Sequence, residues 1–239
     1  MLYFFDGTKE GFLSAFPVAF TDPNARLSSK KTQLLLGETS VFIHTDNQKA
    51  ARIAARLQTF DRYCMEDLDT LFRSSMENNE QIAFDYFRFL ATIKRPVKKR
   101  LAEPAVFAAV ECMKKIGTEI HHFHGSIRFM ETESGALYAP FEPDNDIYDL
   151  LVPHFKARLP EYPFVIHDVK RQKAAIYDGK NVFTAPLTEA NVLLSADETA
   201  WQTLWKDYYH AVNIPSRERL RQMRGFMPVR YWKFLPEKQ

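Results

Sequence analysis

Glycine is scarce in this sequence: there are 8 glycines among 239 residues, and no two are spaced G-x-G. The chain therefore has neither a dinucleotide-binding loop nor a Walker A phosphate-binding loop. The HExxH motif of zinc peptidases and the G-x-S-x-G motif of serine hydrolases are also missing. These absences exclude the commonest sequence signatures of enzymes.

Cysteine is rarer still, with only Cys64 and Cys112. Two cysteines exclude a disulfide scaffold, and their spacing is not that of a zinc site. Both fall in helix-like segments, where we expect buried thiols. No stretch approaches the roughly 18 apolar residues of a membrane span, and the start, MLYFFDGTKE, lacks the features of a signal peptide. We therefore expect a cytoplasmic protein with no membrane partner.

Aromatic residues are abundant. They make up 14% of the chain, with 20 phenylalanines, and hydrophobic residues make up 46%. This composition is typical of a globular protein with a sizeable core. The formal net charge is only +2, so the overall charge does not identify a partner.

The hydrophobic spacing favours an α+β fold. Helical periodicity dominates residues 62–93, and Pro104 is placed to begin another helix. After Gly125 the pattern alternates, which predicts an antiparallel sheet over about 125–185, packed with helices from both halves of the chain. Asp178-Gly179 is the strongest hairpin-turn signal.

The domain organisation has two readings. The first is a single compact unit over residues 1–239. The alternative divides the chain into a mostly helical part, 1–103, and an α+β part, 104–239.

Two helices are predicted in the second half of the chain. The segment DNDIYDLLVPHFKARL, residues 144–159, reads as a capped helix with an inner proline. The segment 197–212 reads as an amphipathic helix capped by Asp197, and its apolar stripe consists of Trp201, Leu204, Trp205 and Tyr208.

Charge is segregated along the sequence. Residues 86–102 hold six cations and no acid, and residues 215–239 hold seven cations, five of them arginine, against two glutamates. Between them, residues 131–149 hold six acids and no cation. A basic run is often only a solvated face, but the last segment also contains Phe226, Tyr231 and Trp232. Arginine interleaved with aromatics is typical of surfaces that bind single-stranded nucleic acid.

The C-terminal FMPVRYWKFLPEKQ allows two interpretations, a tail that covers the core or a surface that grips an anionic partner. We expect both in part. Trp232 and Phe234 would close the core, and Arg230 with the preceding arginines would face the ligand.

Three histidines gather in TEIHHFHGSIRF. On a helix His121 and His124 face one way and could bind one metal ion, although histidines near a helix C-terminus are also favoured by the helix dipole. Glu119-x-x-His122 resembles half of a di-iron motif, but the surrounding pattern is not a four-helix bundle.

Carboxylates supply a second candidate chemistry. Glu142 or Asp146 could hold a divalent metal together with Asp168, or could serve only as helix-capping acids. His154 and Asp168 could form a general-base pair, or an ordinary half-buried hydrogen bond. No cofactor is evident from the sequence.

Several strings together resemble a known family. They are FFDGTKEGFLSAF, EIHHFHGSIRF, LYAPFEPDNDIYDLLVPHFKARL, PFVIHDVKRQKAAIYDGK and FMPVRYWKFLPE. In this order they resemble an uncharacterised bacterial family of DNA-repair or DNA-metabolism proteins. The characteristic positions of that family correspond here to His121, Arg128, Tyr138, Glu142, Pro143, His154, Asp168, Arg171, Arg230, Tyr231 and Trp232.

The resemblance implies a genomic partnership with a radical SAM protein that modifies or repairs DNA. Some relatives are fused to a uracil-DNA glycosylase-like domain, whose motifs this sequence lacks.

Three functional hypotheses follow. The first is a protein that binds DNA and the radical SAM partner, with nucleic acid held by Arg128, Arg171, Arg221, Arg224, Arg230, Tyr231 and Trp232. The second is a hydrolase of nucleic acid or damaged nucleotides, with a site formed by His121, Glu142, His154 and Asp168, with or without a divalent metal. The third is an adaptor for the partner enzyme that makes no DNA contact.

Overall fold

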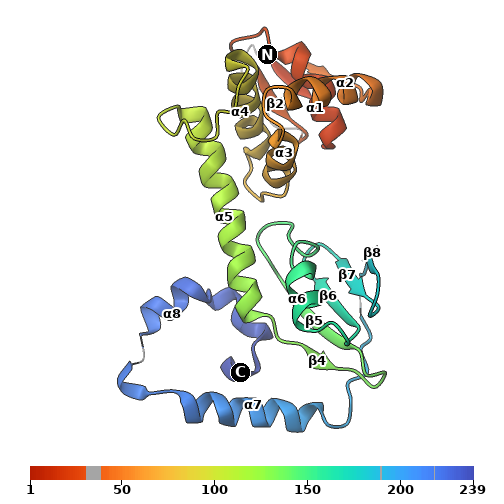
Figure 1. Cartoon of the computed structure of the whole chain (residues 1–239), viewed down its shortest axis with the longest axis vertical. Coiled ribbons are helices and arrows are strands. Elements are labelled where there is room, and N and C mark those ends of the chain that lie inside the picture. The colour runs from red at the N-terminus through yellow and green to blue at the C-terminus, as the bar shows by residue number, and fades with distance from the viewer. Residues whose placement is uncertain (31–38, 189, 218) are drawn as a thin grey trace. The chain divides into compact units, whose positions relative to one another are not determined.

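The computed structural model describes residues 1–30, 39–188, 190–217 and 219–239. The chain divides into two compact units, Met1–Ile116 and Gly117–Gln239. The residues of helix α5 (Pro104–Ser126) fall on both sides of the division between these units in the sequence. Figure 1 labels most of the helices and strands. Pro104 begins α5 as predicted, since the first residue of a helix needs no hydrogen-bonded N–H.

The first unit packs helices around a small parallel sheet (Figure 1). The strands lie in the order β2-β1-β3, and both neighbours run parallel to the central strand. The elements are β1 (Leu2–Phe4), α1 (Lys9–Ala19), β2 (Arg26–Ser28), β3 (Ser40–Phe42), α2 (Asn47–Gln58), α3 (Cys64–Phe72) and α4 (Asn79–Ile93), followed by the start of α5.

Phenylalanine rings form the core of this unit. Phe12 on α1 lies edge-on to Phe87 on α4, with ring centroids 6.1 Å apart, and Phe16 meets Phe84 in the same way at 5.8 Å. All four rings are buried. Edge-to-face aromatic pairs of this kind add to the stabilisation from burial alone.

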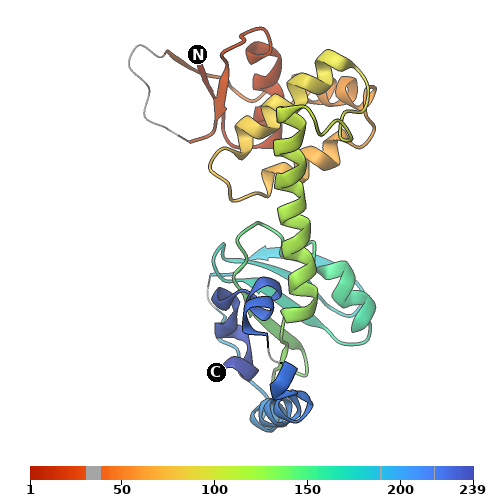
Figure 2. The same ribbon diagram turned by 90° about the vertical axis from the view of Figure 1, so that its left-hand side faces the viewer.

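The second unit is built on a five-stranded sheet of order β4-β5-β6-β7-β8. Figure 2 shows this sheet beside the last turns of α5 and the C-terminal segments. Its elements after α5 are β4 (Met130–Glu131), β5 (Leu137–Phe141), α6 (Val152–Arg158), β6 (Phe164–Asp168), β7 (Lys173–Tyr177), β8 (Val182–Pro186), α7 (Glu198–Val212), η1 (Pro215–Arg217), α8 (Leu220–Phe226), η2 (Val229–Phe234) and η3 (Pro236–Lys238).

The α+β prediction is confirmed, and the sheet is mostly antiparallel. The predicted hairpin at Asp178-Gly179 joins β7 to β8, and Gly179 takes the positive φ of 96° that a tight turn requires. One pair departs from the antiparallel pattern. Strands β5 and β6 run parallel because the connection through α6 returns the chain to the end of the sheet at which β5 begins.

The helix predicted over 144–159 is much shorter than expected. Helix α6 begins at Val152, and Pro153 lies in its first turn instead of its interior. The preceding residues form turns because the backbone N–H groups of Asp144 and Asn145 donate to the side chain of Glu119. A distant carboxylate thus replaces the local helical hydrogen bonds.

Helix α7 forms where predicted, but its apolar stripe is not buried. Trp201, Leu204 and Tyr208 are each more than half exposed, and Trp205 is 37% exposed. Asp197 precedes the helix but its side chain makes no capping hydrogen bond. The helix is held to the unit by Glu198, whose carboxylate accepts from Glu131 N at 2.7 Å.

The structure also bears on membrane spans and on the two cysteines. Among the residues placed by the structure, no helix is both long and apolar enough to cross a membrane. Cys64 and Cys112 are free and buried, as predicted.

Candidate functional site

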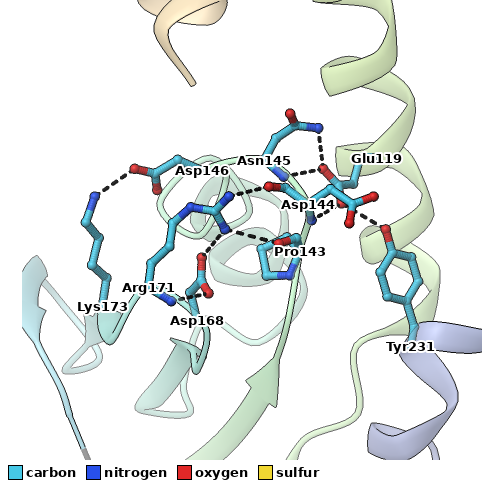
Figure 3. Close-up of polar contacts among 9 residues, drawn as sticks. All are labelled: Glu119, Pro143, Asp144, Asn145, Asp146, Asp168, Arg171, Lys173 and Tyr231. Carbon is cyan, nitrogen blue, oxygen red and sulfur yellow. Dashed lines mark hydrogen bonds and ion pairs between the residues drawn. The ribbon is translucent and has the colours of Figure 1, made fainter. Parts of the chain in front are cut away.

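The segment that follows β5, residues 143–145, is held by hydrogen bonds from two sides (Figure 3). On one side Glu119 of α5 accepts four hydrogen bonds. Oε1 accepts from Asp144 N at 2.6 Å and from the Tyr231 hydroxyl at 2.8 Å, and Oε2 accepts from the Asn145 backbone N at 3.0 Å and from Asn145 Nδ2 at 2.6 Å. The carboxylate is buried, so these donors replace its hydration shell.

Arg171 holds the same segment from the other side. Its guanidinium donates to Pro143 O at 3.1 Å and also to Asp144 O. It forms an ion pair of 2.9 Å with Asp168, whose side chain is fully buried at the end of β6. The planar arginine fork suits this role, because it satisfies two carbonyls and a carboxylate at once.

Three acidic side chains in and next to this segment each have a cationic partner. Glu142 pairs with Lys233 at 2.6 Å, Asp144 with Arg230 at 2.5 Å, and Asp146 with Lys173 at 2.7 Å. Three of the six acids in the acidic run are therefore compensated by basic residues from β7 and η2. These pairs are partly solvent-exposed, so they fix register more than they stabilise the fold.

The C-terminal side chains that are buried in the core are not the ones that the sequence predicted. Tyr231 and Leu235 close the core, at 3% and 1% exposure, while Trp232 and Phe234 are only half-buried. The Tyr231 ring lies 4.4 Å from that of Phe123. Burial, followed by the charge of Glu119, raises the pKa of the Tyr231 hydroxyl, so it stays protonated as a hydrogen-bond donor.

Two further candidates, Trp232 and Arg128, also have partners inside the unit. Trp232 donates its indole N–H to Met227 O at 2.9 Å. Arg128 forms an ion pair of 2.6 Å with the buried carboxylate of Glu237, which also accepts from Trp205 Nε1 at 2.9 Å. Burial raises the pKa of Glu237, but the hydrogen bonds from Arg128 and Trp205 outweigh it and hold that pKa below its usual range.

The four predicted catalytic residues have separate surroundings. Glu142 and Asp168 flank the segment gripped by Glu119 and Arg171, each in its own ion pair. His154 instead stacks on His124, with ring centroids 4.1 Å apart and planes 11° from parallel. His121 is exposed on α5.

The donor set does not resemble a metal centre. Among the residues that the structure describes, no three His, Cys, Asp or Glu side chains lie close enough to hold one ion. The expected pairing of His154 with Asp168 is replaced by the His124 stack and by the Asp168–Arg171 ion pair. The arrangement can hold a loop in place, and it leaves the carboxylates of Glu142 and Asp168 already paired with cations.

Tyr138 and His167 form a further polar chain across the sheet. The Tyr138 hydroxyl lies 2.7 Å from His167 Nδ1, and His167 Nε2 lies 2.9 Å from Leu187 O. Since a carbonyl only accepts, Nε2 carries the hydrogen and Nδ1 accepts from Tyr138. Burial raises the pKa of Tyr138, so this hydroxyl remains a donor.

The arginines around α8 differ from all of these. Arg217, Arg219, Arg221 and Arg224 are exposed, and none has an ion-pair partner within the described part of the chain. They flank exposed apolar side chains of the same segment, Leu220 and Phe226. Counting only the residues that the structure describes, this segment presents cationic charge to solvent without internal compensation.

Sequence reasoning missed Glu119 and Glu237. The local pattern marks Glu119 only as an iron-ligand candidate beside His122, and Glu237 only as one acid in a basic tail. Their partners lie 112 and 109 residues away in sequence, at Tyr231 and Arg128. No local spacing could reveal such pairs. The one available signal was a lone carboxylate on an otherwise apolar helix face.

One comparison with known proteins gave a match. A family described as a domain of unknown function, DUF4130, matches residues 77–237. No curated protein and no solved structure matches this chain.

Proposed function

This chain belongs to the DUF4130 family, a domain of unknown function, and we propose that it is a DNA-metabolism protein that binds nucleic acid through the arginines around α8. The C-terminal segment is basic and aromatic in character, as a surface that binds nucleic acid would be. The residues that would contact phosphate are Arg217, Arg219, Arg221 and Arg224.

One observation carries this choice. These four arginines are exposed and uncompensated among the described residues, whereas Arg128, Arg171 and Arg230 are each paired with a carboxylate. A phosphate would have to compete with a partner already in place at the paired arginines. An arginine that neutralises a phosphate releases a counterion condensed on the nucleic acid, and this release drives association.

The partner and compartment follow from the same proposal. The resemblance to DNA-repair proteins suggests a radical SAM enzyme as the partner that acts on the bound strand. A bacterial protein that acts on chromosomal DNA would be located in the cytoplasm, where that DNA lies.

The test is fluorescence anisotropy with labelled single-stranded and duplex DNA, titrated across salt concentrations. Each phosphate contact contributes about −0.7 to the slope of log K against log salt for single strands and about −0.9 for duplex. Four contacts predict a slope of roughly −3 on single strands. Absence of binding at low salt would contradict the proposal.

Paired variants identify the contacts. Arg221→Ala with Arg224→Ala should weaken binding and reduce the single-strand slope by about 1.4 units. Arg52→Ala with Arg56→Ala is the matched control, because it removes two exposed arginines from α2 in the first unit. Equal losses from both pairs would show nonspecific attraction instead of a site.

The adaptor function is a second candidate, favoured by the exposed apolar face of α7. Leu204, Tyr208 and Val212 are each more than half exposed, which is unusual for an amphipathic helix. The partner enzyme could cover this face. Leu204→Glu with Tyr208→Glu should then abolish capture of the radical SAM protein while DNA binding is retained.

A further inference from the structure

A cleft of about 850 Å³ opens within the second unit. It is lined by the end of α5, by α6 and α7, and by the C-terminal 3-10 helices. Aromatic rings make up much of its wall, namely Phe129, Phe155, Trp201, Trp205 and Phe234. Its volume lies in the range of small-molecule sites, and an aromatic lining is suited to a flat, unsaturated ligand.

Trp205 is held in a fixed position at this cleft. Its indole N–H donates to Glu237 Oε2 at 2.9 Å, and the Arg128 guanidinium lies 5.1 Å from its ring centroid. Arg128 is itself anchored on Glu237 at 2.6 Å. A ring that is already oriented loses little conformational freedom when a second ring stacks on it.

Trp201 extends this surface. It precedes Trp205 by four residues on α7 and therefore faces the same side of the helix. Both indoles line the cleft, and Trp201 is 57% exposed. An indole this exposed gains contact area when a planar group covers it.

Polar groups are also present around the cleft. Gln202 and Gln239 contribute side-chain amides, and Glu131 contributes a carboxylate. Amides and carboxylates match the donors and acceptors on the edge of a base. Arg158 also lines the cleft; it is exposed and has no ion-pair partner in the part of the chain that the structure places. An arginine in this setting suits a phosphate.

We propose that this cleft binds one unstacked nucleobase, with Trp201 as the stacking residue and Arg158 toward the adjoining phosphate. The inference deepens the proposed function and rests on it as far as the base belongs to a bound strand. The aromatic wall, the base-edge donors and acceptors and the exposed Arg158 guanidinium together favour a nucleotide over a purely apolar ligand.

The experiment compares the full-length protein with Trp201→Ala. A single-stranded oligonucleotide carrying one 2-aminopurine reports stacking through its fluorescence, and its anisotropy reports affinity across salt. Loss of one stacked base should weaken binding about 5- to 150-fold. The salt slope should stay unchanged, since no phosphate contact is removed, and the fluorescence change should be lost.

Tyr208→Ala is the matched control. It removes another exposed aromatic from α7, but Tyr208 does not line the cleft. It should leave both signals as in the wild type. Wild-type strand binding with no 2-aminopurine signal, or with no effect of Trp201→Ala, would overturn the inference while leaving the proposed function intact.

A second titration separates the two proposals. The chain has 3 tryptophans, two of which line the cleft, so quenching of tryptophan fluorescence by free dAMP reports occupancy without a strand. Quenching that Trp201→Ala reduces would support the cleft even if no strand bound to α8. No quenching by dAMP, with capture of the radical SAM protein lost in Trp201→Ala, would assign the cleft to a protein partner and overturn the inference.

Discussion

Replacing Glu119 by glutamine should destabilise the second unit by about 2–5 kcal/mol. The substitution preserves the size of the side chain but turns one acceptor oxygen into an NH₂ donor. Each carboxylate oxygen of Glu119 accepts two hydrogen bonds. In either orientation of the glutamine amide, its NH₂ group therefore faces two hydrogen-bond donors and can accept from neither. A hydrogen bond to a charged group contributes about 1.5–3 kcal/mol, and a buried unpaired donor costs about 1–3 kcal/mol.

Tryptophan fluorescence during urea unfolding measures this effect. Trp201, Trp205 and Trp232 all lie in the second unit, so the signal follows that unit alone. The control is Glu133→Gln, an exposed carboxylate in the same second unit. That change should stay within about 0.5 kcal/mol.

Tyr231→Phe gives a further check, since it removes one donor to Glu119. The two substitutions should be non-additive, because they share a hydrogen bond. If Glu119→Gln unfolds at the same urea concentration as the wild type, then the four hydrogen bonds do not hold the 143–145 segment, and the reasoning is refuted.

Two more predictions concern stability. Arg171→Ala should cost the second unit about 3–5 kcal/mol, because it leaves the buried Asp168 carboxylate unpaired; a loss below 1 kcal/mol by urea unfolding would contradict this. His124 has a lowered pKa, first from burial and then from the charges of His154 and His121, so the unfolded chain binds its proton more readily. Stability should therefore be fully present above about pH 6.5 and fall as the pH drops below it. His124→Phe keeps a ring on His154 and should flatten that fall, and an unchanged pH profile of the unfolding midpoint would argue against it.

Local features of the fold were predictable from the sequence. The Asp178-Gly179 turn, the start of α5 at Pro104 and the sheet beyond Gly125 all depend on nearby residues. Helix α6 was predicted too long, because its expected first turns donate their N–H groups to Glu119 instead. A contact made by a residue 25 positions away overrides a local propensity.

The candidate site shows the same limit more strongly. The motif residues were identifiable, but not which of them hold each other. Arg171, Arg230 and Arg128 read alike from sequence as cations for an anionic ligand, yet each has a carboxylate partner within the unit. Only burial and long-range pairing distinguish them from the arginines around α8, and neither is encoded in spacing.

The extent of the family match has a consequence for how this protein can be dissected. The matched region begins at residue 77 and so includes α4 but not the elements before it. On α4, Phe84 and Phe87 are fully buried, and they pack on Phe16 and Phe12 of α1. A fragment cut to residues 77–237 would expose this aromatic face to water and aggregate. The region matched by the family therefore does not coincide with an autonomous folding unit in this chain.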